Sequence, residues 1–430
     1  MSFNFSKVLV AGLALFLFAT AAEKKDITLK DVLKDNKFRI KSITGLKSMK
    51  DGEHYTSLID KKTKIVQYAY ETGAAVDTIF SITNFDNIED IHDYEFSEDE
   101  SKILFYTNRE RIYRHSFYAD YYIWDRTAEK LSKLTDKDKI RIASLSPDAS
   151  KAAYIFENNI YIKDLATGEE KPITTDGRYN KIQNGTPDWV YEEEFGYNKA
   201  YHWSPDGKMI AFLRSDESML KTFNMTRFKG THPSLKENEI YPENYSFKYP
   251  KAGEKNSIVS VHVYHLKNDK TKTMDIGQEI DQYIPRFKWT PDAENLAILR
   301  LNRLQNHLEI LLANPKRGKT KVIYNDRETE YIDDRAFDSF TFVGKHRFLI
   351  SNEQSGSKHV SLYDFKGNKI HNLTAKGNEV SRYYGYDDSN EQIFYSAYGD
   401  KPYNNLLMTA DLQGNVKILV DNEGSNSSKF

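Results

Sequence analysis

A chain of 430 residues is long enough for one large repeat fold or for two or three average domains, and a formal net charge of -2 lacks the basic surplus of a nucleic-acid-binding protein. The absence of cysteine excludes disulfides, thiolate zinc sites and a catalytic cysteine. Aromatic residues make up 13% of the chain, with 29 Tyr and 24 Phe. Because aromatic side chains pack well on pleated surfaces, this composition favours a β-rich protein.

The first 22 residues are typical of a targeting segment. Lys7 is followed by an apolar core at 8–18 (VLVAGLALFLF) and by small residues at 19–21 (ATA) that suit cleavage. The apolar core is too short for a membrane span, which needs about 20 residues. We expect a signal peptide over 1–22 and a secreted or periplasmic bacterial protein, with an uncleaved membrane anchor as the alternative. Residues 23–45 are expected to lead into the folded domain.

One sequence pattern recurs along the chain: an apolar residue, a small polar residue, an acidic turn and an alternating apolar strand. In the turn, Pro presets φ, Asp bonds to its own backbone and Gly accepts a positive φ. The alternating runs are strands with one buried face. The copies are SMKDGEHYTSLI (48–59), EFSEDESKILFYTN (95–108), ASLSPDASKAAYIFENNIYIKDL (143–165), HWSPDGKMIAFLRSDE (202–217), KWTPDAENLAILRLNR (288–303), FTFVGKHRFLISNEQSG (340–356) and GYDDSNEQIFYSAYG (385–399).

This repeat predicts an all-β fold, a β-propeller over residues 46–430. Four short strands at a period of about 45 residues are typical of one propeller blade, and we count seven copies. One interval is longer than the others because it contains residues 219–256, which are rich in Tyr, Pro and Lys. A structureless loop of that length is uncommon, so an inserted hairpin or arm is expected there.

No catalytic machinery is visible in the chain. It has no G-x-S-x-G motif, no phosphate-binding loop and no clustered metal-ligand spacing. His262 and His265 are close in sequence, but their spacing directs them to opposite faces of a strand. We expect no metal site and no cofactor.

The strongest local signal is DWVYEEEFGY (188–197), in which Glu192, Glu193 and Glu194 lie between aromatic residues. A bare triple of glutamates is most often a solvated acidic turn. The flanking Trp and Tyr argue against this, because they would hold the carboxylates against a low-dielectric wall. Neighbouring carboxylates there require a cation, either a protein lysine or a ligand ammonium. A metal is less favoured, since further hard-oxygen ligands are not evident.

A second candidate is Arg114, which lies among aromatics in RERIYRHSFYADYYIWD (109–125). An arginine there can donate a fork of hydrogen bonds to a carbonyl or carboxylate. From the pattern alone, a strand-surface arginine stacked on tyrosines is the commoner interpretation.

These residues resemble the dipeptidyl peptidase IV group, within the prolyl oligopeptidase family of serine peptidases. The resemblance runs in order from about residue 27 to the C-terminus, and its most specific part is the glutamate motif. It implies an eight-bladed propeller that caps an α/β-hydrolase domain. The similar stretches are DWVYEEEFGYNKAYHWSPDGKMIAF (188–212), YRHSFYADYYIWD (113–125), YPKAGEKNSIVSVHVY (249–264) and RLNRLQNHLEILLAN (300–314).

The resemblance also implies roles for single residues. Glu193 and Glu194 would bind the free α-ammonium of a peptide, with Glu192 left as a bystander. Arg114 would hold a substrate backbone carbonyl. The arm at 219–256 would form a homodimer contact, and the implied activity is release of N-terminal X-Pro or X-Ala dipeptides.

The chain departs from the family at 417–430 (KILVDNEGSNSSKF), where the family continues into a last blade and then the hydrolase domain. We therefore expect the substrate-recognition propeller of an exported serine dipeptidyl peptidase, with no catalytic residue in this chain and no activity by itself. Its ligands would be peptides with a free amine. Dipeptidyl and tripeptidyl release stay open. The alternative is a non-catalytic periplasmic propeller that binds a peptide or protein partner.

Overall fold

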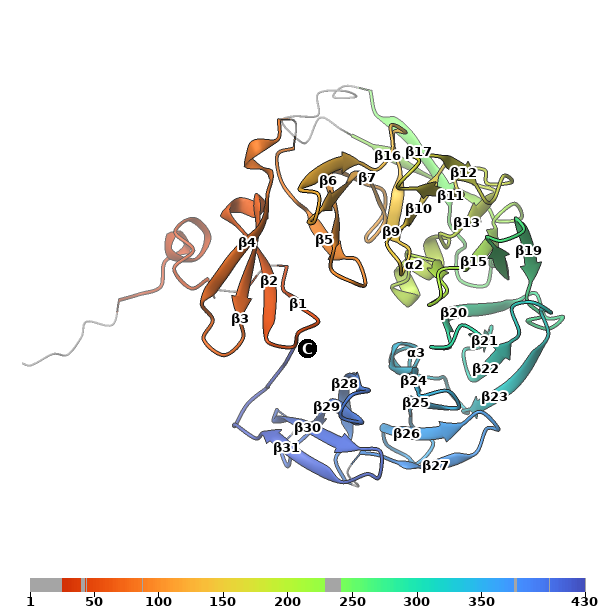
Figure 1. Ribbon diagram of the computed structural model, residues 1–430. Coiled ribbons are helices and arrows are strands. Elements are labelled where there is room, and N and C mark those ends of the chain that lie inside the picture. The colour runs from red at the N-terminus through yellow and green to blue at the C-terminus, as the bar shows by residue number, and fades with distance from the viewer. Residues whose placement is uncertain are drawn as a thin grey trace, which may run out of the picture.

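A computed structural model describes residues 25–39, 43, 45–86, 88–228, 241–374, 377–401 and 403–429, so the expected signal peptide at 1–22 lies outside the described residues. The all-β prediction is confirmed, because seven antiparallel sheets follow one another around a ring (Figure 1). The sheets that form blades have four strands each, except the fourth, which has five. None of the described helices is long and apolar enough to cross a membrane.

The strands of the first three blades run in chain order across each sheet. Blade 1 contains β1 (Lys47–Ser48), β2 (His54–Ile59), β3 (Lys64–Ala69) and β4 (Ala75–Ser81). Blade 2 contains β5 (Asp93–Phe96), β6 (Lys102–Arg111), β7 (Phe117–Asp125) and β8 (Lys130–Lys133). Blade 3 contains β9 (Arg141–Leu145), β10 (Lys151–Phe156), β11 (Asn159–Asp164) and β12 (Glu170–Pro172).

Blade 4 is interrupted by an insertion, and blades 5 to 7 return to the simple order. Blade 4 contains β13 (Ile182–Asn184), β14 (Tyr201–Trp203), β15 (Met209–Asp216), β18 (Ile258–His265) and β19 (Lys270–Thr273). Blade 5 contains β20 (Gln282–Trp289), β21 (Leu296–Asn302), β22 (His307–Ala313) and β23 (Thr320–Arg327). Blade 6 contains β24 (Thr341–Val343), β25 (Arg347–Asn352), β26 (His359–Asp364) and β27 (Lys369–Asn372). Blade 7 contains β28 (Val380–Asp387), β29 (Gln392–Tyr398), β30 (Asn405–Asp411) and β31 (Val416–Val420).

Helical segments are few and short. Outside the sheets lie π-helix η1 (Lys30–Lys34), 3₁₀-helices η2 (Asp60–Lys62) and η3 (Ile82–Asn84), and α-helices α2 (Trp189–Phe195) and α3 (Arg335–Ser339). Both α-helices lie at the inner side of the ring, α2 in blade 4 and α3 just before blade 6 (Figure 1).

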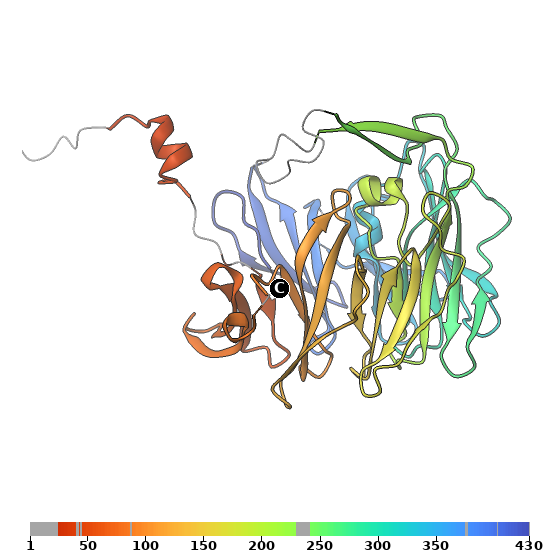
Figure 2. The same ribbon diagram turned by 90° about the horizontal axis from the view of Figure 1, so that it is seen from above.

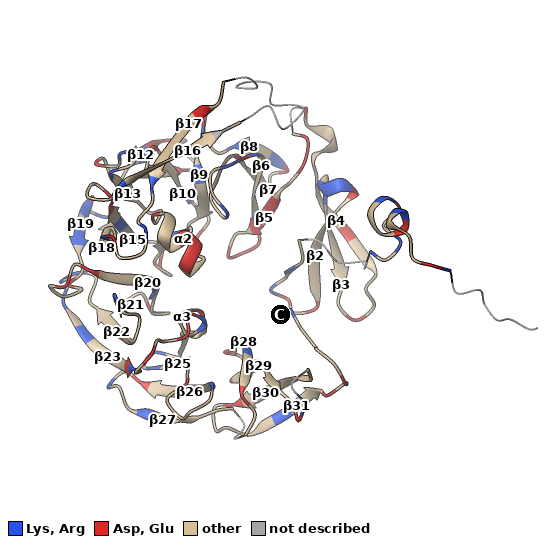
Figure 3. Cartoon of the chain, turned by 180° about the vertical axis from the view of Figure 1, so that it is seen from behind, with Lys and Arg blue, Asp and Glu red and all other residues tan. Residues whose placement is uncertain are grey.

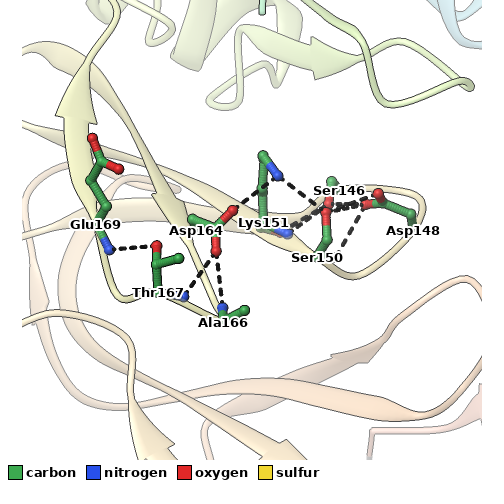
Figure 4. Close-up of polar contacts among 8 residues, drawn as sticks. All are labelled: Ser146, Asp148, Ser150, Lys151, Asp164, Ala166, Thr167 and Glu169. Carbon is green, nitrogen blue, oxygen red and sulfur yellow. Dashed lines mark hydrogen bonds and ion pairs between the residues drawn. The ribbon is translucent and has the colours of Figure 1, made fainter.

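The recurrent Ser-x-Asp motif closes a hairpin of the blade through side-chain hydrogen bonds. In blade 3, Ser146 Oγ donates to Asp148 Oδ1 at 2.6 Å and accepts from Lys151 N at 2.9 Å, while Ser150 N donates to Asp148 at 3.1 Å (Figure 4). Equivalent hydrogen bonds close the turns at Ser97 to Asp99, Ser204 to Asp206 and Thr290 to Asp292. The side-chain hydrogen bonds of this turn motif are thus present in four successive blades, blades 2 to 5.

Asp148→Ala is expected to lower the free energy of unfolding by about 1 kcal/mol, because the hydroxyls and backbone N–H of this turn lose a charged acceptor. The measurement is urea unfolding at neutral pH. Glu169→Ala is the matched control, because it removes an exposed acid from the same blade whose hydrogen bond to Thr167 uses only the backbone N–H (Figure 4). Equal effects of the two substitutions would contradict the role given to Asp148.

The core lies between neighbouring blades. Five clusters of buried apolar residues join the blades in pairs or threes around the ring. Phe80 of blade 1 packs on Phe105 of blade 2 with ring centroids 5.2 Å apart, and Phe105 is fully buried. Burying one such ring stabilises the fold by roughly 1.5–3 kcal/mol. Neighbouring blades therefore hold the inner loops, which carry the candidate site, at fixed distances from one another.

The inserted arm is confirmed as a hairpin of β16 (Thr222–Arg227) and β17 (Glu243–Lys248), which leaves blade 4 between β15 and β18. Figure 2 shows it crossing one face of the ring, on the side where α2 lies. The aromatic rings of Trp189 and Tyr249 lie 4.2 Å apart, and those of Tyr113 and Phe247 lie 5.7 Å apart. The base of the arm therefore packs on the two segments that carry the predicted site residues.

The last residues return to blade 1. The C-terminal end lies beside β1 (Figure 1), where Lys429 Nζ donates to Leu46 O at 2.7 Å. The backbone N–H of Asn405 also donates to Gly424 O at 3.0 Å, which holds the residues after β31 against blade 7. This segment therefore connects blade 7 with blade 1.

Candidate functional site

The glutamate motif forms a two-turn helix, α2, which the sequence pattern did not indicate. The side chain of Asp188 caps the helix by accepting from Tyr191 N at 3.0 Å, and Gly196 ends it in the left-handed conformation with φ 58. Tyr191 and Phe195 are four residues apart, so they share the buried face. Tyr191 Oη accepts from Ile284 N at 2.9 Å, which fixes α2 to blade 5.

Glu192 is buried, and it makes structural contacts that its description as a bystander did not anticipate. Its side chain is 2% exposed, and its Oε1 accepts from His115 N at 2.6 Å and from Ser116 N at 2.8 Å. Ser116 Oγ donates to the second carboxylate oxygen. His115 and Ser116 belong to the loop between β6 and β7, which also carries Arg114. Glu192 therefore positions that loop against α2.

Arg114 and Glu193 are brought together across the chain. Arg114 Nε donates to Glu193 Oε2 at 2.7 Å, and the side chains are 69% and 15% exposed. The sequence analysis expected a cation beside the glutamates, and in this structure Arg114 is that cation. Most of its guanidinium faces solvent, so its other donors can reach a further acceptor.

Glu194, the next residue of α2, is exposed and lines a cavity of about 750 Å³. Phe195 of α2 and the segment from Glu328 to Arg335 form other parts of the wall. Figure 3 shows the acidic residues of α2 at the inner side of the ring, where α3 also lies.

Arg286 holds α2 and α3 together. Its Nη2 donates to Phe195 O at 2.8 Å and its Nε to Asp338 at 2.7 Å. The two α-helices that border the cavity are therefore linked by one side chain. The site combines an exposed arginine, a half-buried glutamate, an exposed glutamate and a neighbouring cavity, which suits an organic ligand with a cationic end.

Comparison with known proteins adds to this geometry. The family model described as dipeptidyl peptidase IV (DPP IV) N-terminal region matches residues 97–430. The chain belongs to this family.

Relatives of the family agree with the assignment. A probable dipeptidyl-aminopeptidase B of Podospora anserina is 30% identical over 77% of this chain and 35% of its own length. A probable dipeptidyl peptidase 4 of Arthroderma benhamiae is 30% identical over 84% of this chain and 46% of its own. The crystal structure of Porphyromonas gingivalis dipeptidyl peptidase 4 is 37% identical with a TM-score of 0.85, covering 93% of this chain and 56% of that one. The chain thus spans about a third to a half of the curated relatives.

Near the site of this dipeptidyl peptidase IV family member lie buried ionisable groups that the sequence patterns did not reveal. Arg141 is 8% exposed, and burial lowers the pKa of its guanidinium; its Nη2 donates to Ser116 Oγ at 3.2 Å. Glu217 is 2% exposed, and burial followed by the charge of Asp188 raises the pKa of Glu217 to about 8. Gln183 Nε2 donates to the Glu217 carboxyl group. Their partners lie far away in sequence, so no local motif marks them.

Glu217→Gln is expected to remove a pH-dependent loss of stability. A carboxyl group whose folded pKa is raised to about 8 must keep its proton, so stability falls as pH rises from the unfolded pKa, near 4.3, toward 8. The free energy of unfolding of the variant should therefore rise relative to that of the wild type as the pH increases from 4 to 8. Urea unfolding from pH 4 to 8 measures this difference. A difference that stays constant with pH would contradict the buried, protonated state of Glu217.

The histidines of HVYH have separate partners. His262 Nε2 lies 2.8 Å from Ser260 Oγ, and His265 Nε2 lies 3.2 Å from Pro315 O. In the part of the chain that the structure describes, no group of three or more His, Cys, Asp or Glu is placed to hold a metal ion.

Proposed function

We propose that this chain is the substrate-recognition propeller of an exported serine dipeptidyl peptidase, which releases N-terminal X-Pro or X-Ala dipeptides. The observation that carries the proposal is the pair Glu193 and Glu194 on α2, in which Glu193 contacts Arg114 and Glu194 lines the cavity. Relatives named dipeptidyl peptidases over this same region support it. The nucleophile would belong to an α/β-hydrolase domain outside these residues, so the chain alone is expected to be inactive.

The two glutamates would measure the substrate from its amine. A peptide ammonium placed at Glu193 and Glu194 makes charge-assisted hydrogen bonds to both carboxylates. Arg114 then has guanidinium donors free for a backbone carbonyl of the same peptide. Because Glu192 anchors the loop of Arg114 to α2, the two contacts would hold the peptide at a fixed distance from a nucleophile. Position is what these side chains contribute.

The test of the proposed function is product analysis with the gene product that includes the hydrolase domain. Gly-Pro and Gly-Ala peptides are incubated with the enzyme, and mass spectrometry identifies the fragments. Free peptides should lose a dipeptide, and N-acetylated peptides should stay intact because they carry no ammonium. Release of tripeptides, or equal cleavage of acetylated peptides, would contradict the proposal.

Export and dimerisation belong to the same proposal. The apolar segment at 8–18 supports export, and detection of the processed protein in a periplasmic or culture fraction tests it.

The arm of β16 and β17 presents the exposed side chains of Phe223 and Met225, which support a homodimer contact. Light scattering should show a dimer that Phe223→Ser weakens, and an unchanged monomer at high concentration would contradict it.

A further inference from the structure

We propose that the cavity beside α2 binds a lysine or arginine side chain at the first position of the peptide. This inference rests on the proposed function, because that function places the peptide's ammonium at Glu193 and Glu194. The first side chain leaves the same Cα that carries the ammonium. Since Glu194 also lines the cavity, a long first side chain can extend into it.

The cavity has a surplus of negative charge. Asp333 is compensated by Lys358 and by Arg335, whose Nη2 lies 2.7 Å from its carboxylate. Other acidic residues of the wall make no ion pair within the described parts of the chain; these are Glu194, Glu328, Glu330 and Asp334. Burial and then the neighbouring acids raise the pKa of Glu328. A ligand cation would relieve this repulsion.

A buried acceptor without a donor lies in a small annex next to the cavity. Asn352 is 5% exposed and lines a small annex that shares Glu328, Asp333 and Glu353 with the cavity wall. No hydrogen bond reaches its Oδ1 from the described residues. A buried acceptor of this kind normally has a partner. Its presence points independently to a ligand or solvent group that donates hydrogen bonds.

The orientation of the Asn352 amide follows from its neighbours. Its Nδ2 lies 3.5 Å from Ser361 Oγ and 3.4 Å from Tyr363 Oη. Both hydroxyls already donate elsewhere, Ser361 to Asn372 Oδ1 at 2.8 Å and Tyr363 to Gln354 Oε1 at 3.2 Å. They can therefore only accept from Asn352, so Nδ2 faces them and Oδ1 is the atom left unpaired.

The cavity suits a long organic cation better than a metal ion. Its volume of about 750 Å³ is far larger than one ion requires, and the described acids form no metal-binding group of three. Phe195, Ile332 and Tyr331 add apolar surface to the wall. Lysine and arginine pack their methylenes on such surface while the charged end reaches carboxylates.

The test compares peptides X-Pro-Gly-Gly-Tyr by calorimetry with this chain, where X is lysine, norleucine or glutamate, together with the N-acetylated lysine peptide. The lysine peptide should bind about tenfold more tightly than the norleucine peptide, and glutamate should bind weakest. In the double variant Glu328→Gln and Glu330→Gln, the lysine preference should fall below about threefold. The matched control Glu71→Gln and Glu169→Gln removes two exposed acids from blades 1 and 3 and should leave the preference unchanged.

The outcomes separate the two proposals. Equal binding of the lysine and norleucine peptides overturns the inference, as does a lysine preference that survives in the Glu328 and Glu330 variant. The proposed function still stands in these cases if N-acetylation weakens binding of the lysine peptide. Binding that ignores acetylation, or no binding of any peptide, overturns both.

Discussion

Glu193→Gln and Glu194→Gln are each expected to weaken the binding of free-amine peptides by about 10- to 100-fold. Each substitution removes one charge-assisted hydrogen bond to the ammonium, worth about 1.5–3 kcal/mol, and every 1.4 kcal/mol corresponds to tenfold in affinity. The loss should appear in the dissociation constant measured by calorimetry with a Gly-Pro peptide.

The two glutamates differ in their contacts. Glu193 also accepts from Arg114 at 2.7 Å, whereas Glu194 makes no ion pair within the described part of the chain. Glu193→Gln should therefore loosen Arg114 and weaken contacts to the peptide carbonyl as well, so its effect should be the larger. An acetylated peptide, already without the ammonium, should bind Glu194→Gln as it binds the wild type. Unchanged affinity of free-amine peptides for both variants would contradict amine recognition.

Glu192→Ala is expected to lower the free energy of unfolding by about 3 kcal/mol. The change leaves His115 N and Ser116 N without their acceptor and removes the negative charge near the buried Arg141. Breaking a buried charge arrangement by removing one member costs about 3–5 kcal/mol. Urea unfolding at neutral pH measures the loss.

Glu192→Gln serves as the graded control for that loss. The amide keeps an oxygen for the two backbone donors but lacks the charge, so its effect should be smaller. Peptide affinity should fall in Glu192→Ala even where the protein remains folded, because the loop that carries Arg114 loses its anchor. If the free energy of unfolding of the alanine variant lies within about 0.5 kcal/mol of the wild-type value, Glu192 does not have the positioning role.

The fold was readable from the sequence because each blade repeats its own local signals. The Ser-x-Asp turn closes through hydrogen bonds only two to five residues apart, as at Ser146, Asp148 and Lys151. Alternation of apolar residues gives the strands their buried face. The arm was also predictable, since residues 219–256 break the repeat and contain the hairpin of β16 and β17.

The site was readable only in part. Glu193 and Glu194 were singled out by the glutamate motif and Arg114 by its aromatic segment, and the structure brings Arg114 and Glu193 into contact. The role of Glu192 was missed because its partners lie 76 and 77 residues away, where no local pattern connects them. The helical form of α2 was missed as well, since seven residues are too few for a helical periodicity to stand out.

The most direct measurement is a crystal structure of this chain with a bound Gly-Pro-containing peptide. The account predicts the peptide's terminal nitrogen at about 2.7–2.9 Å from carboxylate oxygens of both Glu193 and Glu194, with a backbone carbonyl facing Arg114. A peptide that binds with its amine in solvent, or that places its carboxyl end or only a side chain at these glutamates, would contradict the account.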